Sequence, residues 1–344
     1  MNRDPGWPSV TPQAFILTTE TTTATPPVSA LLAGKGRGIV DRFGDRALYV
    51  LTLAAALLSV AIVLGLAYKI VDEASSAFST FGFGFLTSSD FDPVKGNFGA
   101  ADFIYGTVVS SFGALLLATP ISIAIALFLT ELAPRSSRTA IGTLVELLAG
   151  IPSVILGLWG IIILGPFLND HFEPILHAVL GWIPLFGGQY GLVGMFPAIL
   201  ILTIMTVPIV SSLTREIFAT VPPTDKEGAL ALGATRWEMI KTVVLPYSRP
   251  GIVGAVILGL GRAVGEAIAV TQVIGNTAAI HSNIFLPADT LASKIANSYQ
   301  GAATDLQISS LAYFAVILFV LSLIFNSVAR LLVRSVESRA RSSG

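Results

Sequence analysis

The sequence contains no cysteine and few charged residues. Without cysteine, the chain forms no disulfide bond, no thiolate nucleophile and no cysteine–metal site. Charged residues make up 12% of its 344 residues, against about 25% in soluble proteins. Hydrophobic residues make up 53%, and the mean hydropathy is +0.78. A surface with so little charge would be poorly wetted, so the composition excludes an ordinary water-soluble domain.

Metal-ligating and nucleotide-binding patterns are also missing from the sequence. His171, His177 and His281 lie outside the long apolar runs and show neither metal-ligand spacing nor an arrangement that activates a nucleophile. The pattern G-x-x-x-x-G-K-[ST], which cradles the phosphates of ATP, does not occur. We therefore expect no catalytic residue, no metal, no cofactor and no nucleic-acid partner. Any ATP must be bound and hydrolysed by another chain.

Long hydrophobic runs dominate the rest of the chain. Runs of about 20 residues cross roughly 30 Å of hydrocarbon as helices. The runs cover approximately 46–68, 103–131, 140–166, 192–213, 251–273 and 307–333. These runs predict an all-α polytopic membrane protein with six transmembrane helices surrounded by lipid.

Lysine and arginine are distributed unevenly between the two sides of these runs. The three residues on one side are Lys69, Lys95 and Lys294. The other side carries Arg3, Lys35, Arg37, Arg42, Arg46, Arg135, Arg138, Arg215, Lys226, Arg236, Lys241, Arg249, Arg330, Arg334, Arg339 and Arg341. Because basic residues are retained in the cytoplasm, this bias predicts that both termini are cytoplasmic.

The segments outside the apolar runs define the expected domains. Residues 1–45 are polar, include TTETTTATPP (18–27) and resemble neither a folded domain nor a signal peptide. We expect a disordered cytoplasmic tail over 1–45, a transmembrane domain over 46–335 and a short cytoplasmic tail over 336–344. The outward loops carry aromatic residues, as in FSTFGFGFL (78–86), that fit interfacial anchoring, a docking surface for an external partner, or both.

The inward segment 214–250 is expected to contain two short helices at an angle. Residues 222–223 are both proline and interrupt any helix leaving the fourth run. Thr224 with Glu227 fits a capping box that begins a helix. Gly233 is the residue type that ends helices with positive φ.

A second capping box follows in the same segment. Thr235 with Glu238 is expected to begin a helix over TRWEMIKTVVL, and Pro246 is expected to end it. The result would be a hinged pair of helices projecting into the cytosol. By itself, such a pair could be an ordinary surface hairpin.

The whole pattern EGALALGATRWEMIKTVVLP (227–246) resembles the EAA coupling loop of ABC-importer permeases. The positions that match the motif are Glu227, Ala229, Gly233, Val243, Leu245 and Pro246. Gly228 stands where the motif has alanine, which loosens a helix by up to about 1 kcal/mol, and Val243 replaces isoleucine. We take residues 224–246 as the candidate coupling loop to an ATPase.

Four further segments extend the resemblance over roughly 46–335. They are IYGTVVSSF (104–112), ALFLTELAP (126–134), ELLAGIPSVILGLWG (146–160) and LGLGRAVGEAIAVTQVIGN (258–276). Together they are similar to the PstC-type permease of the phosphate ABC importer. The resemblance implies a type I ABC-importer permease architecture in the cytoplasmic (inner) membrane. It further implies phosphate as substrate, a sibling permease in a heterodimer, a cytosolic ATPase dimer and an external phosphate-binding protein.

The segment LGLGRAVGEAIAV (258–270) places two opposite charges inside an apolar run. Counted from Gly251, Arg262 lies about 16 Å and Glu266 about 22 Å into the span. An arginine at that depth costs about 2.5–3.5 kcal/mol. Residues four apart share one helix face and can pair, but an apolar pair would avoid the desolvation cost altogether. The charges are therefore expected to serve more than stability.

Two interpretations of Arg262 and Glu266 remain open. The pair either anchors this helix structurally, within the chain or to the sibling permease, or lines an anion pathway. A guanidinium presents donors that suit phosphate oxygens, and an adjacent carboxylate competes for it and helps release the anion. Glu266 could also accept a hydrogen bond from the O–H of phosphate, which sulfate lacks.

Other intramembrane groups carry weaker indications. Glu146, about 9 Å into the third run, could pair with Arg262, line an inner vestibule or reach the interface. Ser153, after Pro152, could satisfy a freed carbonyl or face the pathway. The glycines at 259, 261 and 265 lack the context of a dinucleotide fingerprint and favour close helix packing over backbone contact with an ion.

Three functions other than phosphate permease are considered for this sequence pattern. A permease for another oxyanion or solute would carry the same coupling loop. A proton-coupled secondary transporter or channel would use Glu266 or Glu146 and need no ATPase, which the coupling loop argues against. An intramembrane hydrolase is disfavoured because Ser153 has no histidine partner within the spans.

Overall fold

The computed structural model describes residues 39–342, with side chains for residues 43–134 and 136–331. The described residues form helices and loops with two isolated β-bridges and no β-strand, which confirms the all-α prediction. The chain divides within its first helix into two compact units, residues 1–63 and 64–344. The packing described below belongs to the second unit.

The helices follow one another with short connections. The α-helices are α2 (Ile39–Phe81), α3 (Ala101–Leu127), α4 (Arg135–Ala149), α5 (Ser153–Trp159), α6 (Gly165–Phe167), α7 (Glu173–Leu180), α8 (Met195–Ala219), α9 (Pro223–Ala231), α10 (Arg236–Met239), α11 (Leu245–Gly265), α12 (Ile268–Val273), α13 (Leu291–Ser298) and α14 (Asp305–Ser342). The 3₁₀ segments are η1 (Gly82–Leu86), η5 (Pro184–Phe186) and η7 (Tyr299–Gly301). The π-helical segments are η2 (Phe128–Leu132), η3 (Gly160–Leu164), η4 (Leu168–Phe172) and η6 (Ile240–Val244).

Six helical stretches of the described residues are long and apolar enough to cross a membrane, as expected. They are Phe43–Leu86, Ala101–Leu132, Ser153–Leu180, Met195–Ala219, Arg236–Gly265 and Asp305–Leu331. The third and the fifth differ from the expected runs 140–166 and 251–273. Both differences bear on the candidate site.

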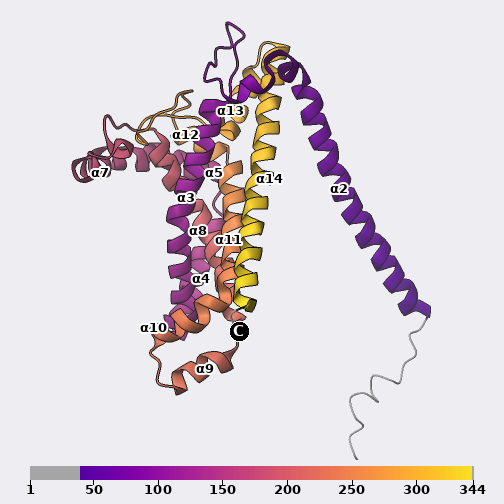
Figure 1. Ribbon diagram of the computed structural model, residues 1–344, viewed down its shortest axis with the longest axis vertical. Coiled ribbons are helices and arrows are strands. Elements are labelled where there is room, and N and C mark those ends of the chain that lie inside the picture. The colour runs from indigo at the N-terminus through magenta and orange to yellow at the C-terminus, as the bar shows by residue number, and fades with distance from the viewer. Residues whose placement is uncertain (1–38, 343–344) are drawn as a thin grey trace, which may run out of the picture. The chain divides into compact units, whose positions relative to one another are not determined.

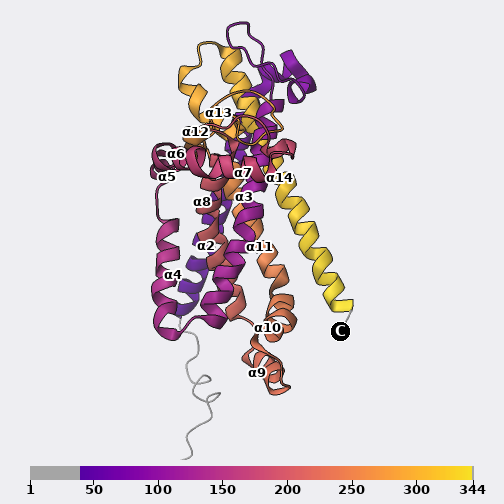
Figure 2. The ribbon, with the colours of Figure 1, turned by 90° about the vertical axis from the view of Figure 1, so that its left-hand side faces the viewer.

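The third expected run is broken at Pro152, so its boundaries were wrong. Helix α4 ends at Ala149, and α5 begins at Ser153. Pro152 has no N–H to donate and holds an extended backbone, with φ −58° and ψ 137°, so one helix cannot continue through it. Glu146 consequently lies on α4, which runs along the bundle, and not in the span Ser153–Leu180 (Figure 2).

The fifth expected run begins earlier and ends earlier than predicted. Pro246 was expected to end a helix, but the chain stays helical from Arg236 to Gly265. The π-helical turns of η6 precede Pro246, and their wider i→i+5 bonding accommodates the missing N–H. At the other end, the helix stops at Gly265, and Glu266 takes an extended backbone with ψ 119°.

Helices extend into both segments that were expected to be tails. Most of the expected N-terminal tail, residues 1–38, lies outside the described residues, and Ile39 already begins α2. At the other end, α14 continues to Ser342 through the segment expected to be a tail. This segment has no proline or glycine before Gly344 to end the helix.

The central helix of the bundle is α8, which packs against α3 and α11, while α14 packs against α11. Its burial is the highest of the six spans, with 72% of its apolar window buried. At Gly259 of α11, an added Cβ would lie 2.7 Å from Val210 Cγ2 and 2.8 Å from Thr206 Cγ2, so glycine permits this close approach to α8.

The bundle has two structurally different ends (Figure 1). Helices α9 and α10, together with the end of α14, lie at one end, which we call the α9/α10 end. The short helices α12 and α13 lie at the opposite end, the α12/α13 end. Near this second end, α7 extends sideways from the bundle (Figure 1).

Candidate functional site

The candidate coupling loop forms a hinged elbow of two helices, α9 and α10. Gly233, after α9, has φ +89°, a left-handed conformation that strains any other residue. The N–H of Ala234 donates to the carbonyl of Ala229 at 3.1 Å, which closes the end of α9 in the manner of a Schellman motif. The glycine hinge predicted from the sequence is therefore present.

One of the two predicted capping boxes forms. Thr235 Oγ1 accepts from the N–H of Glu238 at 3.3 Å, and the carboxylate of Glu238 accepts from the N–H of Thr235 at 2.8 Å. The predicted box of Thr224 with Glu227 is wrong, because α9 begins at Pro223 with Pro222 as its N-cap. Proline at the first helical position already has the required φ, so no side-chain cap is used.

The coupling residues predicted from the motif occupy different environments. Glu227 and Gly228 are exposed on α9, whereas Ala229 is partly buried against an apolar cluster around Phe218. Leu245 and Pro246 begin α11 and are partly buried. The elbow thus has one face joined to the bundle and one face directed to solvent.

The solvent-facing side of the elbow carries large apolar side chains. Leu232 is 91% exposed, Trp237 65% and Leu230 42%. Exposed apolar residues clustered on one structural element commonly mark a binding surface. Trp237 and Leu232 flank the Gly233 hinge, so the cluster covers the bend of the elbow.

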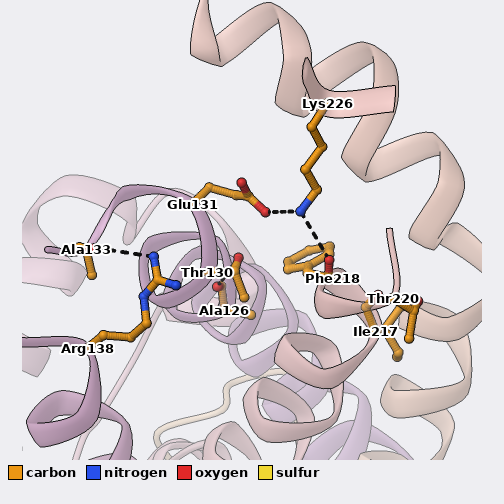
Figure 3. Close-up of polar contacts among 9 residues, drawn as sticks. All are labelled: Ala126, Thr130, Glu131, Ala133, Arg138, Ile217, Phe218, Thr220 and Lys226. Carbon is orange, nitrogen blue, oxygen red and sulfur yellow. Dashed lines mark hydrogen bonds and ion pairs between the residues drawn. The ribbon is translucent and has the colours of Figure 1, made fainter. Parts of the chain in front are cut away.

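Two ion pairs lie behind the elbow. Lys226 of α9 donates to Glu131 Oε1 of η2 at 2.6 Å, and Arg215 of α8 pairs with Glu146 of α4 (Figure 3 for the first pair). A cavity of about 420 Å³ between them is lined by Leu129, Thr130, Glu131, Arg138, Arg215, Glu216, Phe218, Ala219 and Lys226. Of the three alternatives for Glu146, pairing with Arg262 is not the one observed, because the guanidinium of Arg215 pairs with its carboxylate.

Arg262 and Glu266 do lie together, at the point where α11 ends. The distance from Arg262 Nη2 to Glu266 Oε2 is 3.6 Å, which makes a loose ion pair. Glu266 Oε1 also accepts from the N–H of Ala269 at 3.3 Å, in the first turn of α12. The carboxylate is 9% exposed, but the Arg262 side chain is 43% exposed. The guanidinium therefore keeps donors that are free to bind a further group.

Among the described residues, no side chain covers the face of α11 around Arg262. An added Cβ at Gly254, Gly261 or Gly265 would meet nothing within 4 Å, and Leu258 is 60% exposed. The expected close packing applies to Gly259 alone among the three glycines at 259, 261 and 265. Within the described chain, the other two face open space beside the guanidinium.

Ser153 is separated from this pair. Helix α5 runs antiparallel to α12, since Val154 accepts from Gln272 Nε2 at 3.4 Å and a Cβ at Gly157 would lie 2.9 Å from Ala269 Cα. Ser153 therefore lies at the end of α12 away from Glu266. Among the four expected pathway residues, the structure joins only Arg262 and Glu266.

Acids that are buried and were not predicted from the sequence include Glu173 and Asp289. Glu173 is fully buried between η4 and α7, and neither carboxylate oxygen has a hydrogen-bond partner. The segment 167–191 was expected to be an outward loop, and an acid in such a loop is expected to be exposed to solvent. Its position in a helical, largely apolar stretch is the signal that could have identified it.

Asp289 is another of these acids, at the α12/α13 end. It is 2% exposed, and burial raises its pKa to about 6, although the nearby ammonium of Lys294 opposes the shift. Burial also lowers the pKa of Lys294, whose Nζ lies 4.4 Å from the ring centroid of Phe91 and 5.6 Å from that of Phe103. These contacts tie the segment 82–100 to α3 and α13.

Comparisons with known proteins agree with one another. The family described as "Binding-protein-dependent transport system inner membrane component" matches residues 107–338. The phosphate transport system permease protein PstC of Mesorhizobium japonicum is 45% identical over 87% of this chain and 94% of that protein. PstC of Pasteurella multocida is 44% identical over 76% of this chain and 83% of its own length. PstC of Xylella fastidiosa is 40% identical over 87% and 93%.

Solved structures share the fold at lower identity. A chain of a bacterial ABC transporter involved in the import of the acidic polysaccharide alginate aligns with TM-score 0.55 and 21% identity, over 84% of this chain and 97% of that chain. A second alginate transporter structure, in complex with a pentasaccharide-bound periplasmic protein, gives TM-score 0.52 and 22% identity, over 87% and 99%. At these identities the likeness concerns the fold alone.

Proposed function

The chain belongs to the family of binding-protein-dependent transport inner-membrane components and, within it, to the PstC-type permeases. From this premise we propose that it is the membrane-spanning permease subunit of an ATP-driven phosphate importer, coupled to a separate ATPase through the elbow. It is a transport component and not an enzyme. The observation that carries the proposal is the half-exposed guanidinium of Arg262 at the break between α11 and α12, in a chain of this family.

The distribution of basic residues supports an orientation with the α9/α10 end in the cytoplasm. Arg215, Lys226 and Arg236 belong to segments at that end, whereas Lys95 and Lys294 belong to segments at the α12/α13 end. Retention of basic residues in the cytoplasm then puts the elbow, and the end of α14, on the ATPase side. The N-terminus would share that side, and the inner membrane would hold the six spans.

The elbow suits a docking role toward a cytosolic ATPase dimer. Leu232 and Trp237 offer apolar surface for a cleft on the partner, and the Gly233 hinge fixes the angle between α9 and α10. A pair of ordered helices transmits rigid-body motion, whereas a flexible loop would absorb it. ATP stays on the partner chains, so this chain needs no nucleotide site.

The open face of α11 suits a pathway shared with a sibling permease. Gly261 and Gly265 leave space beside Arg262 that a second permease subunit or a substrate can enter. In that space the guanidinium would attract the anion, and Glu266, already paired at 3.6 Å, would compete for it and help release it. An external phosphate-binding protein would deliver the anion at the α12/α13 end.

Reconstitution of the complex with its ATPase, sibling permease and binding protein in proteoliposomes tests the proposal. We expect uptake of labelled phosphate that requires ATP on the α9/α10 side and continues in the presence of an uncoupler. Uptake that ceases with the uncoupler and needs no ATP would instead identify a proton-coupled transporter. Preferential uptake of sulfate or another solute would keep the ABC mechanism but reject phosphate as the substrate.

A further inference from the structure

A single lysine joins the elbow to two helices of the bundle. Lys226 Nζ, on α9, donates to Glu131 Oε1 at 2.6 Å and to the carbonyl of Phe218 at 3.4 Å (Figure 3). Glu131 lies in η2, which continues α3, and Phe218 lies in the last turn of α8. One ammonium group therefore contacts the ends of the two helices that form the centre of the bundle.

The contacts of Lys226 place a cation at the C-terminal end of α8. The last carbonyls of a helix have no partner within it and carry partial negative charge, which attracts a cation. The carbonyl of Phe218 lies at that end of α8, where it also accepts from the N–H of Val221 at 3.4 Å, and the Glu131 carboxylate adds a full negative charge. The Lys226 and Glu131 side chains are 19% and 11% exposed, so water screens their interaction little.

Helix α9 follows α8 after the short link 220–222, but this link does not reach α3. Among the hydrogen bonds and ion pairs of the described residues, those of Lys226 are the ones that join α9 to η2 and α8. Asp225, Glu227 and Leu230 are exposed, and Ala229 supplies apolar packing. Through the ammonium group, a movement of α9 therefore reaches η2, at the end of α3, as well as α8.

Packing contacts continue from α8 to the end of α11, where Arg262 and Glu266 lie. Along α8, Val210 and Thr206 contact α11 where Gly259 permits close approach. Gly259 lies three residues before Arg262, so a shift of α8 moves the segment that carries the guanidinium. Packed contacts of this kind form a contiguous mechanical route between two sites.

We propose that Lys226 and Glu131 are positioning residues that transmit the movement of α9 into α3 and α8, so that the pair couples ATP hydrolysis to transport. The inference rests on the proposed function, since it needs a partner ATPase that moves the elbow. Neither residue contacts the substrate. Their role is to keep the elbow and the central helices moving as one body.

Measurement of phosphate uptake per ATP hydrolysed, in the reconstituted wild-type and variant complexes, tests this link. In Lys226→Met we expect that ratio to fall about tenfold, within the range of coupling between distant sites, while substrate-stimulated ATP hydrolysis persists. Lys226→Arg keeps the cation and should retain a ratio close to wild type. Lys69→Met removes the exposed Lys69–Asp72 pair on α2, at 3.9 Å, and serves as the matched control with an unchanged ratio.

A double variant that lacks both charges distinguishes a loss of coupling from a loss of folding. Lys226→Met alone leaves the Glu131 carboxylate partly buried without a counter-charge, which can destabilise the chain by itself. The double variant Lys226→Met with Glu131→Met removes both charges, so we expect normal assembly with the ATPase by co-purification and a ratio that stays low. A double variant that transports at the wild-type ratio would overturn the proposal.

The remaining outcomes are equally decisive. Equal loss of uptake and ATP hydrolysis in Lys226→Met, with full recovery of both in the double variant, would show a structural role only and reject transmission. Absence of ATP-dependent phosphate uptake in the wild-type complex would reject the proposed function, before any variant is compared. The two failures are therefore distinguished by the wild-type measurement.

Discussion

The charges at the α9/α10 end and those at the break of α11 are arranged in opposite ways. Behind the elbow, Lys226 lies 2.6 Å from Glu131, and both side chains are less than one fifth exposed. At the break, Arg262 lies 3.6 Å from Glu266, and the arginine side chain is 43% exposed. The first pair is closed within the chain, whereas the second leaves its cation accessible.

The difference in distance and exposure indicates that the Lys226–Glu131 pair stabilises the structure, whereas Arg262 is accessible to a ligand. A buried lysine and carboxylate in short contact hold two elements together and have little capacity for a third partner. A loosely paired guanidinium has five donors in a planar fork and can exchange its carboxylate for another oxyanion. The comparison predicts that loss of charge affects coupling at the elbow and substrate handling at the break.

The largest expected effect is on Arg262. Arg262→Ala should lower phosphate uptake roughly a hundredfold, because an anion in low dielectric loses a charge-assisted donor. Basal ATP hydrolysis and assembly should persist, since the side chain is accessible and not part of the core. Initial rates of uptake in proteoliposomes measure the effect, and a normal rate would remove Arg262 from the pathway.

Glu227, on the exposed face of α9, should show the next largest effect. Glu227→Ala should lower substrate-stimulated ATP hydrolysis about tenfold, if its carboxylate contributes to docking, because an interfacial charge lost from its partner costs a few kcal/mol at most. Co-purification with the ATPase distinguishes weaker docking from misfolding. Unaltered stimulation would show that the elbow docks through Leu232 and Trp237 without this acid.

Glu266→Gln should change selectivity more than rate. Phosphate near neutrality still carries an O–H group that a carboxylate can accept, whereas sulfate has none. We expect phosphate uptake to fall several-fold, because the glutamine amide oxygen still accepts the hydrogen bond but without the negative charge, and we expect sulfate uptake to rise. Competition between the two labelled anions reports the change, and unchanged phosphate uptake would exclude the role.

A smaller effect is expected for substitution of Glu146, which tests whether an ion pair near the elbow influences the anion preference at the break. Its carboxylate is 53% exposed and paired with Arg215 behind the elbow, away from Arg262. Glu146→Gln should therefore leave the preference for phosphate over sulfate unchanged and alter the uptake rate little, because exposed ion pairs contribute roughly 1 kcal/mol or less. A change of anion preference would return Glu146 to the pathway.

The smallest effect on transport is expected for substitution of Asp289, which should instead change how the stability of the protein depends on pH. Its pKa is raised by burial from 3.8 to about 6, so the protonated form favours the folded state. Stability from this group is fully present below pH 3.8 and is lost as the pH rises through 6. Asp289→Asn should remove this part of the pH dependence, as measured by thermal unfolding in detergent between pH 4 and 7. Persistence of the wild-type profile would contradict the assignment.

Local features of the sequence predicted much of this structure. Six apolar runs, the hinge at Gly233 and the capping box at Thr235 depend on residues close together in the chain. The break at Glu266 was not predicted, because hydrophobic periodicity shows which residues are apolar but not where the backbone leaves the helix. Pro246 was misread because a π-helical segment allows a proline that an α-helix would reject.

The candidate site was predictable only in part. Arg262 and Glu266 are four residues apart, so helix geometry predicts that they pair, and the pair forms even though α11 ends at Gly265, one residue before Glu266. Lys226 and Glu131 are separated by 95 residues, and nothing in either local segment indicates that α9 folds back on η2. Pairing with Arg262 was one of three alternatives for Glu146, and its observed partner, Arg215, lies 69 residues away, so tertiary packing decides the pairing.

In the proposed transporter, the continuous helix from Arg236 to Gly265 would act as a second mechanical link between the elbow and the guanidinium, beside the route through Lys226. At 1.5 Å per residue, its length up to Arg262 is about 39 Å. A tilt of about 5° at the pivot then displaces the far tip by about 3 Å, which is the span of one hydrogen bond. In the proposed transporter, a small angular movement of the ATPase would therefore be enough to make or break the contact between the guanidinium and an anion, without separation of the membrane spans.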